Sequence, residues 1–153
     1  MNGAGRRGFW SSRPRITRES LQVVGVVALG GVVGSLLRYQ ASLIWPNPPG
    51  SFPTTILLVN LLGCLVIGVF LTLITERWTA HRLVRPFFGT GVLGGFTTFS
   101  TYSLDIVTLV RLGSPVQAAT YLLLTAIGAM LAVGLGMLTT RRLLVGPTKE
   151  GRQ

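Results

Sequence analysis

Gly94-Gly95-Phe96-Thr97-Thr98-Phe99-Ser100-Thr101-Tyr102 interrupts an uncharged run that extends from residue 86 to residue 104. A membrane-spanning helix would ordinarily carry Leu and Val there. In lipid, non-helical backbone and polar side chains are tolerated only where protein or a water-filled path receives them. The two glycines and the hydroxyl residues after them therefore predict a functional segment of a polytopic membrane protein, with a helix interrupted at this point.

The composition of the whole chain is that of a membrane protein. Hydrophobic residues make up 48% of the 153 positions and charged residues only 12%, well below the roughly 25% usual in soluble domains. No charged residue lies between Arg38 and Glu76 or between Arg111 and Arg141, and each gap exceeds the ~20 residues that cross a bilayer. We predict an all-α membrane protein with four transmembrane helices, near 21–39, 54–74, 86–110 and 115–138, the third interrupted at its centre.

The predicted spans leave little room for other domains. Residues 1–18 are expected to form a mobile basic tail, residues 19–142 the transmembrane domain, and residues 143–153 a short C-terminal tail. The connections between the spans are short, so no soluble domain is predicted. Because four spans cannot enclose a wide pore by themselves, we expect an oligomer.

The net charge of +10 would suggest nucleic-acid binding in a soluble protein. In this chain the basic residues flank the predicted spans, where they set orientation and meet anionic lipid. We therefore expect membrane lipid as a partner, and no nucleic acid.

Glycine patterns in the chain favour helix packing over nucleotide binding. Residues 89–94 match the G-x-G-x-x-G pattern, but a dinucleotide site needs a preceding strand and an acidic residue about 20 positions later. Gly30 and Gly34, like Gly91 and Gly95, have the G-x-x-x-G spacing that lets helix backbones approach closely.

Three polar features inside or beside the spans are open to two interpretations each. Asn60 could make an interhelical hydrogen bond, or its amide could line a polar path for an anion. Arg38 could reach the membrane interface, or concentrate anions at a pore mouth. Tyr121 and Thr125, spaced i, i+4, share a helix face and could form a hydroxyl track, although Thr often bonds its own helix.

The interrupted segment offers contacts for both signs of charge. A broken helix leaves carbonyl groups free to bind a small cation. Phe99 and Tyr102 project from a similar face if helix resumes there, and their electropositive ring edges suit a small hard anion. The alternative is an aromatic stripe packed in the bundle core.

Several function classes lack the residues that they need. A proton-coupled transporter requires an intramembrane carboxylate, and the spans contain only Asp105, at the far end of the third. No nucleophile, base and orienting group occur together, so an enzyme is not expected. Cys64 is the single cysteine and excludes an intrachain disulfide.

Three segments resemble, in order, the Fluc/CrcB family of bacterial fluoride channels. They are Gly30-Gly31-Val32-Val33-Gly34 through Arg38-Tyr39, then Pro53-Thr54-Thr55 through Asn60 and Gly63, then Gly94 to Thr101 in the sequence quoted above. The resemblance covers all four spans. It implies an antiparallel dimer of four-helix subunits with two narrow pores and one structural Na+ at the central axis.

The same resemblance implies roles for individual residues. The backbone carbonyls of Gly94 and Thr97 would hold Na+. The residues that would contact fluoride in the pore and its vestibule are Arg38, Asn60, Phe99, Tyr102, Tyr121 and Thr125. At position 102 the family usually has a phenylalanine, so Tyr102 departs from its pattern.

The predicted function is a passive channel that lets fluoride leave the bacterial cytoplasm across the plasma membrane. The alternatives are a small dual-topology, proton-coupled exporter and a non-conducting partner subunit of a channel. Twelve of the 14 Lys and Arg residues fall on the side of the termini. Because positive charge sets orientation, the dimer partner could be an identical chain or an oppositely oriented paralogue, and the imbalance favours the paralogue.

Overall fold

The computed structural model describes residues 17–48, 50–76 and 81–144, and all regular structure within them is helical, as predicted. The elements are α1 (Arg18–Ile44), α2 (Thr54–Glu76), the π-helical segment η1 (Pro86–Val92), α3 (Leu93–Phe96), α4 (Phe99–Arg111) and α5 (Pro115–Leu144). The predicted tails lie mostly outside the described residues; α1 begins at Arg18 behind the N-cap Thr17, and α5 extends to Leu144.

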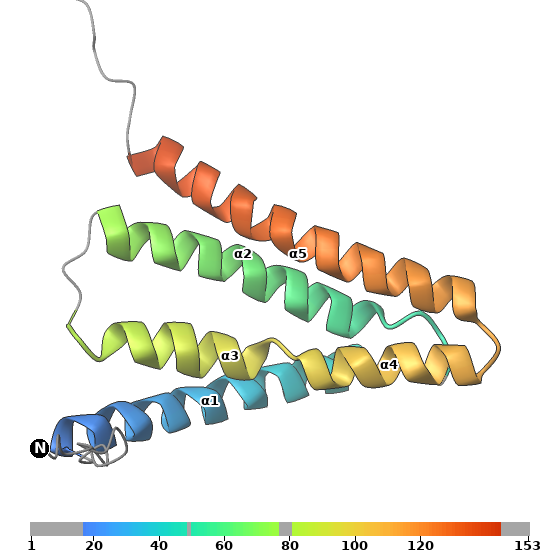
Figure 1. The fold of residues 1–153 in the computed structure, drawn as a ribbon, viewed down its shortest axis with the longest axis horizontal. Coiled ribbons are helices and arrows are strands. Elements are labelled where there is room, and N and C mark those ends of the chain that lie inside the picture. The colour runs from blue at the N-terminus through green and yellow to red at the C-terminus, as the bar shows by residue number, and fades with distance from the viewer. Residues whose placement is uncertain (1–16, 49, 77–80, 145–153) are drawn as a thin grey trace, which may run out of the picture.

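The helices run back and forth along one long axis (Figure 1). Helix α2 packs on α5, whereas α1 packs on η1 and α3, and α4 closes against α5. Gly113, with φ of 77°, makes the tight turn that ends α4 and lets α5 begin at Pro115, a backbone conformation that costs glycine little.

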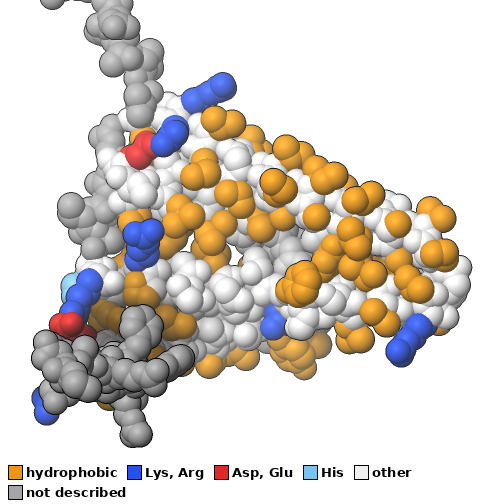
Figure 2. Space-filling model, viewed as in Figure 1, with side chains coloured by type: hydrophobic (Ala, Val, Ile, Leu, Met, Phe, Trp, Pro, Cys, Tyr) orange, Lys and Arg blue, Asp and Glu red, His pale blue; other side chains and the backbone are white. Residues whose placement is uncertain are grey.

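Three helices of the described chain, α1, α2 and α5, are long and apolar enough to cross a membrane. Most of the large apolar side chains of α1 and α5 are exposed on the surface, whereas α2 is more buried and exposes only Leu58, Leu62 and Val66 (Figure 2). A soluble protein rarely exposes apolar patches of this extent, whereas lipid accepts them. The chain is a membrane protein.

Charged side chains gather at one end of the molecule (Figure 2). Arg82 pairs there with Glu19 at 2.7 Å, and Arg141 pairs with Glu76. Exposed pairs of this kind contribute little to stability. Both pairs lie at the end of the molecule that holds the start of α1 and the end of α5 (Figure 1). We call it the basic end, because Arg18, Arg85 and Arg142 lie at the same helix ends and leave it net positive.

Glycines bring α1 against η1 and α3, as the G-x-x-x-G spacing predicted. A Cβ at Gly30 would lie 2.5 Å from the carbonyl oxygen of Phe87, and a Cβ at Gly91 would lie 2.9 Å from Gly30 Cα. Gly34 faces the backbone of Val92 and Phe96 with equally little space. Without a hydrophobic driving force between helices in lipid, this close backbone packing is a principal source of association.

Gly34→Ala is expected to lower the thermal unfolding midpoint of the detergent-solubilised protein, because the added methyl group meets fixed backbone. The cost should be about 1–3 kcal/mol, typical of overpacking. Gly25→Ala on the same helix is the control, since a Cβ there has no atom within 4 Å. Equal midpoints for the two variants would show that the α1 contact is not close-packed.

Candidate functional site: a cavity where α3 gives way to α4

Two threonines separate α3 from α4. Helix α3 ends with a bond from the Thr97 N–H to the Leu93 carbonyl, at 3.0 Å. Thr97 and Thr98 then have extended backbones, with ψ of 152° and 125°. Thr98 is the N-cap of α4, and its Oγ1 accepts from the Thr101 N–H at 3.2 Å. A Thr at this position satisfies one of the free N–H groups of the new helix.

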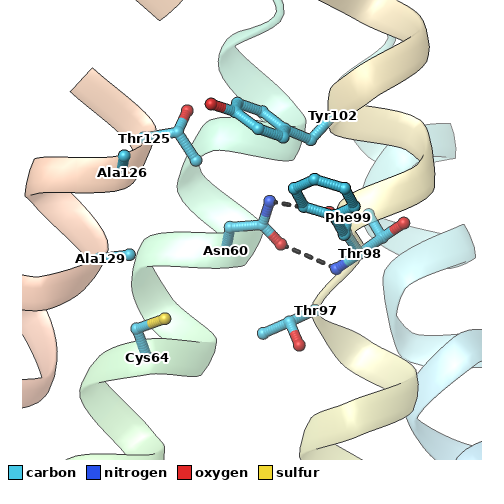
Figure 3. A pocket seen from close by; sticks show the side chains of 9 residues that line it. All are labelled: Asn60, Cys64, Thr97, Thr98, Phe99, Tyr102, Thr125, Ala126 and Ala129. Carbon is cyan, nitrogen blue, oxygen red and sulfur yellow. Dashed lines mark hydrogen bonds between the residues drawn. The ribbon is translucent and has the colours of Figure 1, made fainter. Parts of the chain in front are cut away.

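Asn60, from the middle of α2, pairs with the backbone of Thr98. Its Oδ1 accepts from the Thr98 N–H at 2.9 Å, and its Nδ2 donates to the Thr98 carbonyl at 3.1 Å (Figure 3). The side chain is 7% exposed. The amide therefore supplies both hydrogen bonds that a neighbouring peptide group would give, and the interhelical bond expected of Asn60 is present.

A second helix holds the other side of the junction. Arg38 Nε donates to the Gly95 carbonyl at 3.2 Å, and Ser35 Oγ donates to the same oxygen at 3.5 Å. Both residues come from α1, which the glycine contacts bring close. Arg38 thus contacts the end of α3 directly.

The carbonyls of Gly94 and Thr97 lose their usual helical partners at this junction. In a continuous helix they would accept from the N–H groups four residues later, which belong to Thr98 and Thr101. Those two N–H groups donate instead to the Asn60 and Thr98 side chains. Free carbonyl oxygens suit a small hard cation, so the donor set fits Na+. No cluster of three His, Cys, Asp or Glu in the described part of the chain could hold a metal.

A cavity of 340 Å³ opens beside the junction, between α2, α4 and α5 (Figure 3). Thr125 is 6% exposed and its Oγ1 has no hydrogen-bond partner among the described residues. Phe99 is 79% exposed at the cavity wall, with its ring 5.8 Å from that of Tyr102. The lining residues are Asn60, Cys64, Thr97, Thr98, Phe99, Tyr102, Thr125, Ala126 and Ala129.

The structure brings Asn60, Phe99, Tyr102 and Thr125 together around this cavity. Arg38 and Gly94 are not among its lining residues. Tyr121 is fully buried, and its hydroxyl donates to Asp105 Oδ2 at 3.3 Å.

The hydroxyl that distinguishes Tyr102 from a phenylalanine is engaged within the protein. It donates to the carbonyl of Leu122 on α5 at 2.9 Å. The phenol thereby connects α4 to α5.

The sequence analysis assigned no site role to Cys64, Thr98 or Ser35. Cys64 lies four residues after Asn60, so the helical period places both on one face of α2. Ser35 precedes Arg38 by one turn in the same way. Thr98 carried the signal of a helix N-cap, a Thr immediately before a resumed helix.

Comparisons with known proteins identify a family and relatives of this chain. Residues 25–137 match the family model described as CrcB-like protein, Camphor Resistance (CrcB). Fluoride-specific ion channel FluC 2 of Streptomyces avermitilis is 56% identical over 122 residues, which cover 80% of this chain and 73% of the relative.

Two further relatives are covered more fully. Fluoride-specific ion channel FluC 1 of Streptomyces coelicolor is 55% identical over 83% of this chain and 82% of the relative. FluC 2 of Nocardia farcinica is 52% identical over 82% of this chain and 90% of the relative. These names describe channels, not enzymes. With a family model matching most of its length and relatives above 50% identity, the chain belongs to the CrcB family.

Proposed function

We propose that this chain is a fluoride-selective, passive channel of the bacterial plasma membrane that lets F⁻ leave the cytoplasm. The observation that carries the proposal is the cavity at the α3–α4 junction, which is lined by the Asn60 amide, Thr125, the exposed ring of Phe99 and the buried ring of Tyr102. The names of the relatives, fluoride-specific ion channels, supply the identity of the anion. A negative interior drives the anion outward.

The cavity residues provide replacements for the hydration shell of the ion. Asn60 uses one amide hydrogen for Thr98, which leaves the second N–H for an anion. The Thr125 hydroxyl, which is buried beside the cavity and has no hydrogen-bond partner among the described residues, is a further donor. Phe99 presents a positive ring edge. A narrow path lined by such weak, multiple donors admits a small anion and releases it again.

The third span of the channel comprises residues 86–111, with the two threonines as its interruption. Two four-span subunits, in antiparallel orientation, complete the ion paths. A structural Na+ at the centre of the dimer, held by the carbonyls of Gly94 and Thr97, would supply fixed positive charge near the junction without being transported. The exposure of Gly94 and the diverted hydrogen bonds around it support this position.

Proton-coupled export is the weaker alternative. Asp105, the acidic residue of the third span, lies in the middle of α4 and accepts a hydrogen bond from Tyr121. It lines a separate cavity of 130 Å³ with loop residues such as Asn47 and Ser51. A carrier that alternates a proton with a substrate would need the carboxylate in the polar path, where Asn60 is found.

Purified protein in liposomes is expected to release F⁻ passively and Cl⁻ at least ~100-fold more slowly, because the larger ion does not fit a path built for a small one. An ion-selective electrode follows each efflux after the membrane potential is collapsed with valinomycin. Equal F⁻ and Cl⁻ rates, or F⁻ efflux that requires an imposed pH gradient, would contradict the channel.

Phe99→Ile should reduce F⁻ efflux by at least about tenfold, equivalent to about 1.4 kcal/mol of barrier, because the electropositive edge is lost while an apolar side chain is kept. Phe88→Ile, also exposed but outside the cavity, is the matched control. Tyr102→Phe should keep most of the flux, since its ring edge remains. Normal flux in Phe99→Ile would mean that the ring only packs.

The distribution of charge favours one insertion direction. The start of α1, the end of α2, the start of η1 and the end of α5 share the basic end (Figure 1). In the sequence, 12 of the 14 Lys and Arg residues lie at these helix ends or in the segments next to them; Arg38 and Arg111 are the other two. Since cytoplasmic loops retain positive charge, both termini should lie in the cytoplasm. The antiparallel partner is then an oppositely oriented paralogue, and not an identical chain.

A cysteine at position 51 (Ser51→Cys), in a Cys64→Ala background, tests this orientation. When the chain is expressed alone, a membrane-impermeant maleimide applied to spheroplasts should label most of the protein. The control His81→Cys, at the basic end, should be protected. Half labelling of both variants would instead establish dual topology and a homodimer.

A further inference from the structure

Side chains form hydrogen bonds with four backbone groups at the α3–α4 junction. The carbonyls of Gly95 and Thr98 accept from Arg38 and Asn60, at 3.2 and 3.1 Å. The N–H groups of Thr98 and Thr101 donate to the Asn60 and Thr98 side chains, at 2.9 and 3.2 Å. The carbonyls of Gly94 and Thr97, each one residue before a carbonyl that accepts from a side chain, accept no hydrogen bond from any described residue.

This arrangement follows from two side chains. Thr98 Oγ1 takes the N–H that a continuous helix would direct to Thr97, and Asn60 Oδ1 takes the N–H that it would direct to Gly94. If either oxygen were removed, the freed N–H would have to find an acceptor, because an unsatisfied backbone group at membrane depth is costly. The nearest acceptors by helix geometry are the same two carbonyls.

We propose that Asn60 and Thr98 are positioning residues for the small cation at Gly94 and Thr97. They keep both carbonyls free of hydrogen bonds by accepting from the two N–H groups that would otherwise donate to those carbonyls. The inference rests on the cation site of the proposed function and assigns to Asn60 a second role, separate from donating to an anion.

The chemistry of the two side chains makes the proposal specific. A side-chain amide carries its acceptor and its donor on separate atoms, so Asn60 can accept from the Thr98 N–H and donate to the Thr98 carbonyl at the same time. At position 98, serine keeps a capping oxygen, whereas valine keeps the shape of threonine without one. Thr98→Ser and Thr98→Val therefore differ in the cap while both retain a small side chain.

Cation binding can be measured without transport. Purified, full-length protein in detergent is unfolded by heat over a range of NaCl concentrations, with choline chloride added to constant ionic strength. A ligand that binds the folded state raises the midpoint as its concentration rises. The titration gives an apparent Na+ affinity for each variant.

Thr98→Val and Asn60→Ala should each weaken the apparent Na+ affinity by at least about tenfold, the order of effect of losing one helix cap. Thr98→Ser should stay within about twofold of the unmodified protein. Thr108→Val is the matched control on the same helix, because Thr108 donates to the Leu104 carbonyl on an exposed face, away from the junction. If one variant does not fold, the other is judged by the same criterion.

Unchanged Na+ affinity in Thr98→Val or Asn60→Ala would overturn the proposal, and Asn60 would then act on the anion alone. Absence of any Na+-dependent stabilisation in the unmodified protein would overturn it as well. Neither result bears on fluoride selectivity, which the liposome experiment decides separately. Loss of F⁻ flux with Na+ binding intact would instead contradict the proposed channel and leave the cation site standing.

Discussion

The pairing of the Asn60 amide with both backbone groups of Thr98 is the interaction on which the site depends. A chain that leaves its helix at membrane depth exposes peptide groups that lipid cannot satisfy. Asn60 supplies the missing donor and acceptor from a neighbouring helix, at 3.1 and 2.9 Å. The junction can therefore persist without the loss of two hydrogen bonds, and the cavity forms around it.

The close approach of α1 gives the junction its second support. Gly30 and Gly34 allow α1 to lie directly on the backbone of η1 and α3. Arg38, one turn beyond Gly34, then reaches the Gly95 carbonyl. The π-helical turn before α3 is of a kind often found beside functional sites. Tight packing and polar satisfaction thus act on the same few peptide groups from two different helices.

The surface explains why the fold suits lipid and why one subunit leaves its site open. Exposed apolar side chains cover α1 and α5, and charged groups are concentrated at one end. Phe99, at the cavity wall, remains 79% exposed. A large ring that faces outward beside this cavity is what the proposed second subunit would cover. Tyr102 adds rigidity, because its phenol bonds to α5.

Much of the architecture follows from local sequence. Charge-free segments of sufficient length gave the helices, although α1, α2 and α5 extend beyond the predicted spans. The spacing of Gly30 and Gly34 predicted close helix packing, because backbone approach depends only on small residues one turn apart. Polar and aromatic residues in apolar surroundings were predicted to contact the ion. Four of them line one cavity: Asn60, Phe99, Tyr102 and Thr125.

Tertiary structure decided how each of those residues is used. From the sequence, Asn60 could form an interhelical hydrogen bond or donate to an anion. The structure shows the interhelical bond, because the Asn60 amide donates to the backbone of Thr98, 38 positions away. Tyr121 and Thr125 share a helix face, yet one bonds to Asp105 and the other is unpartnered in the cavity. A side chain's period on its own helix is local, whereas its hydrogen-bond partner depends on which helix packs opposite, and only the assembled bundle determines that.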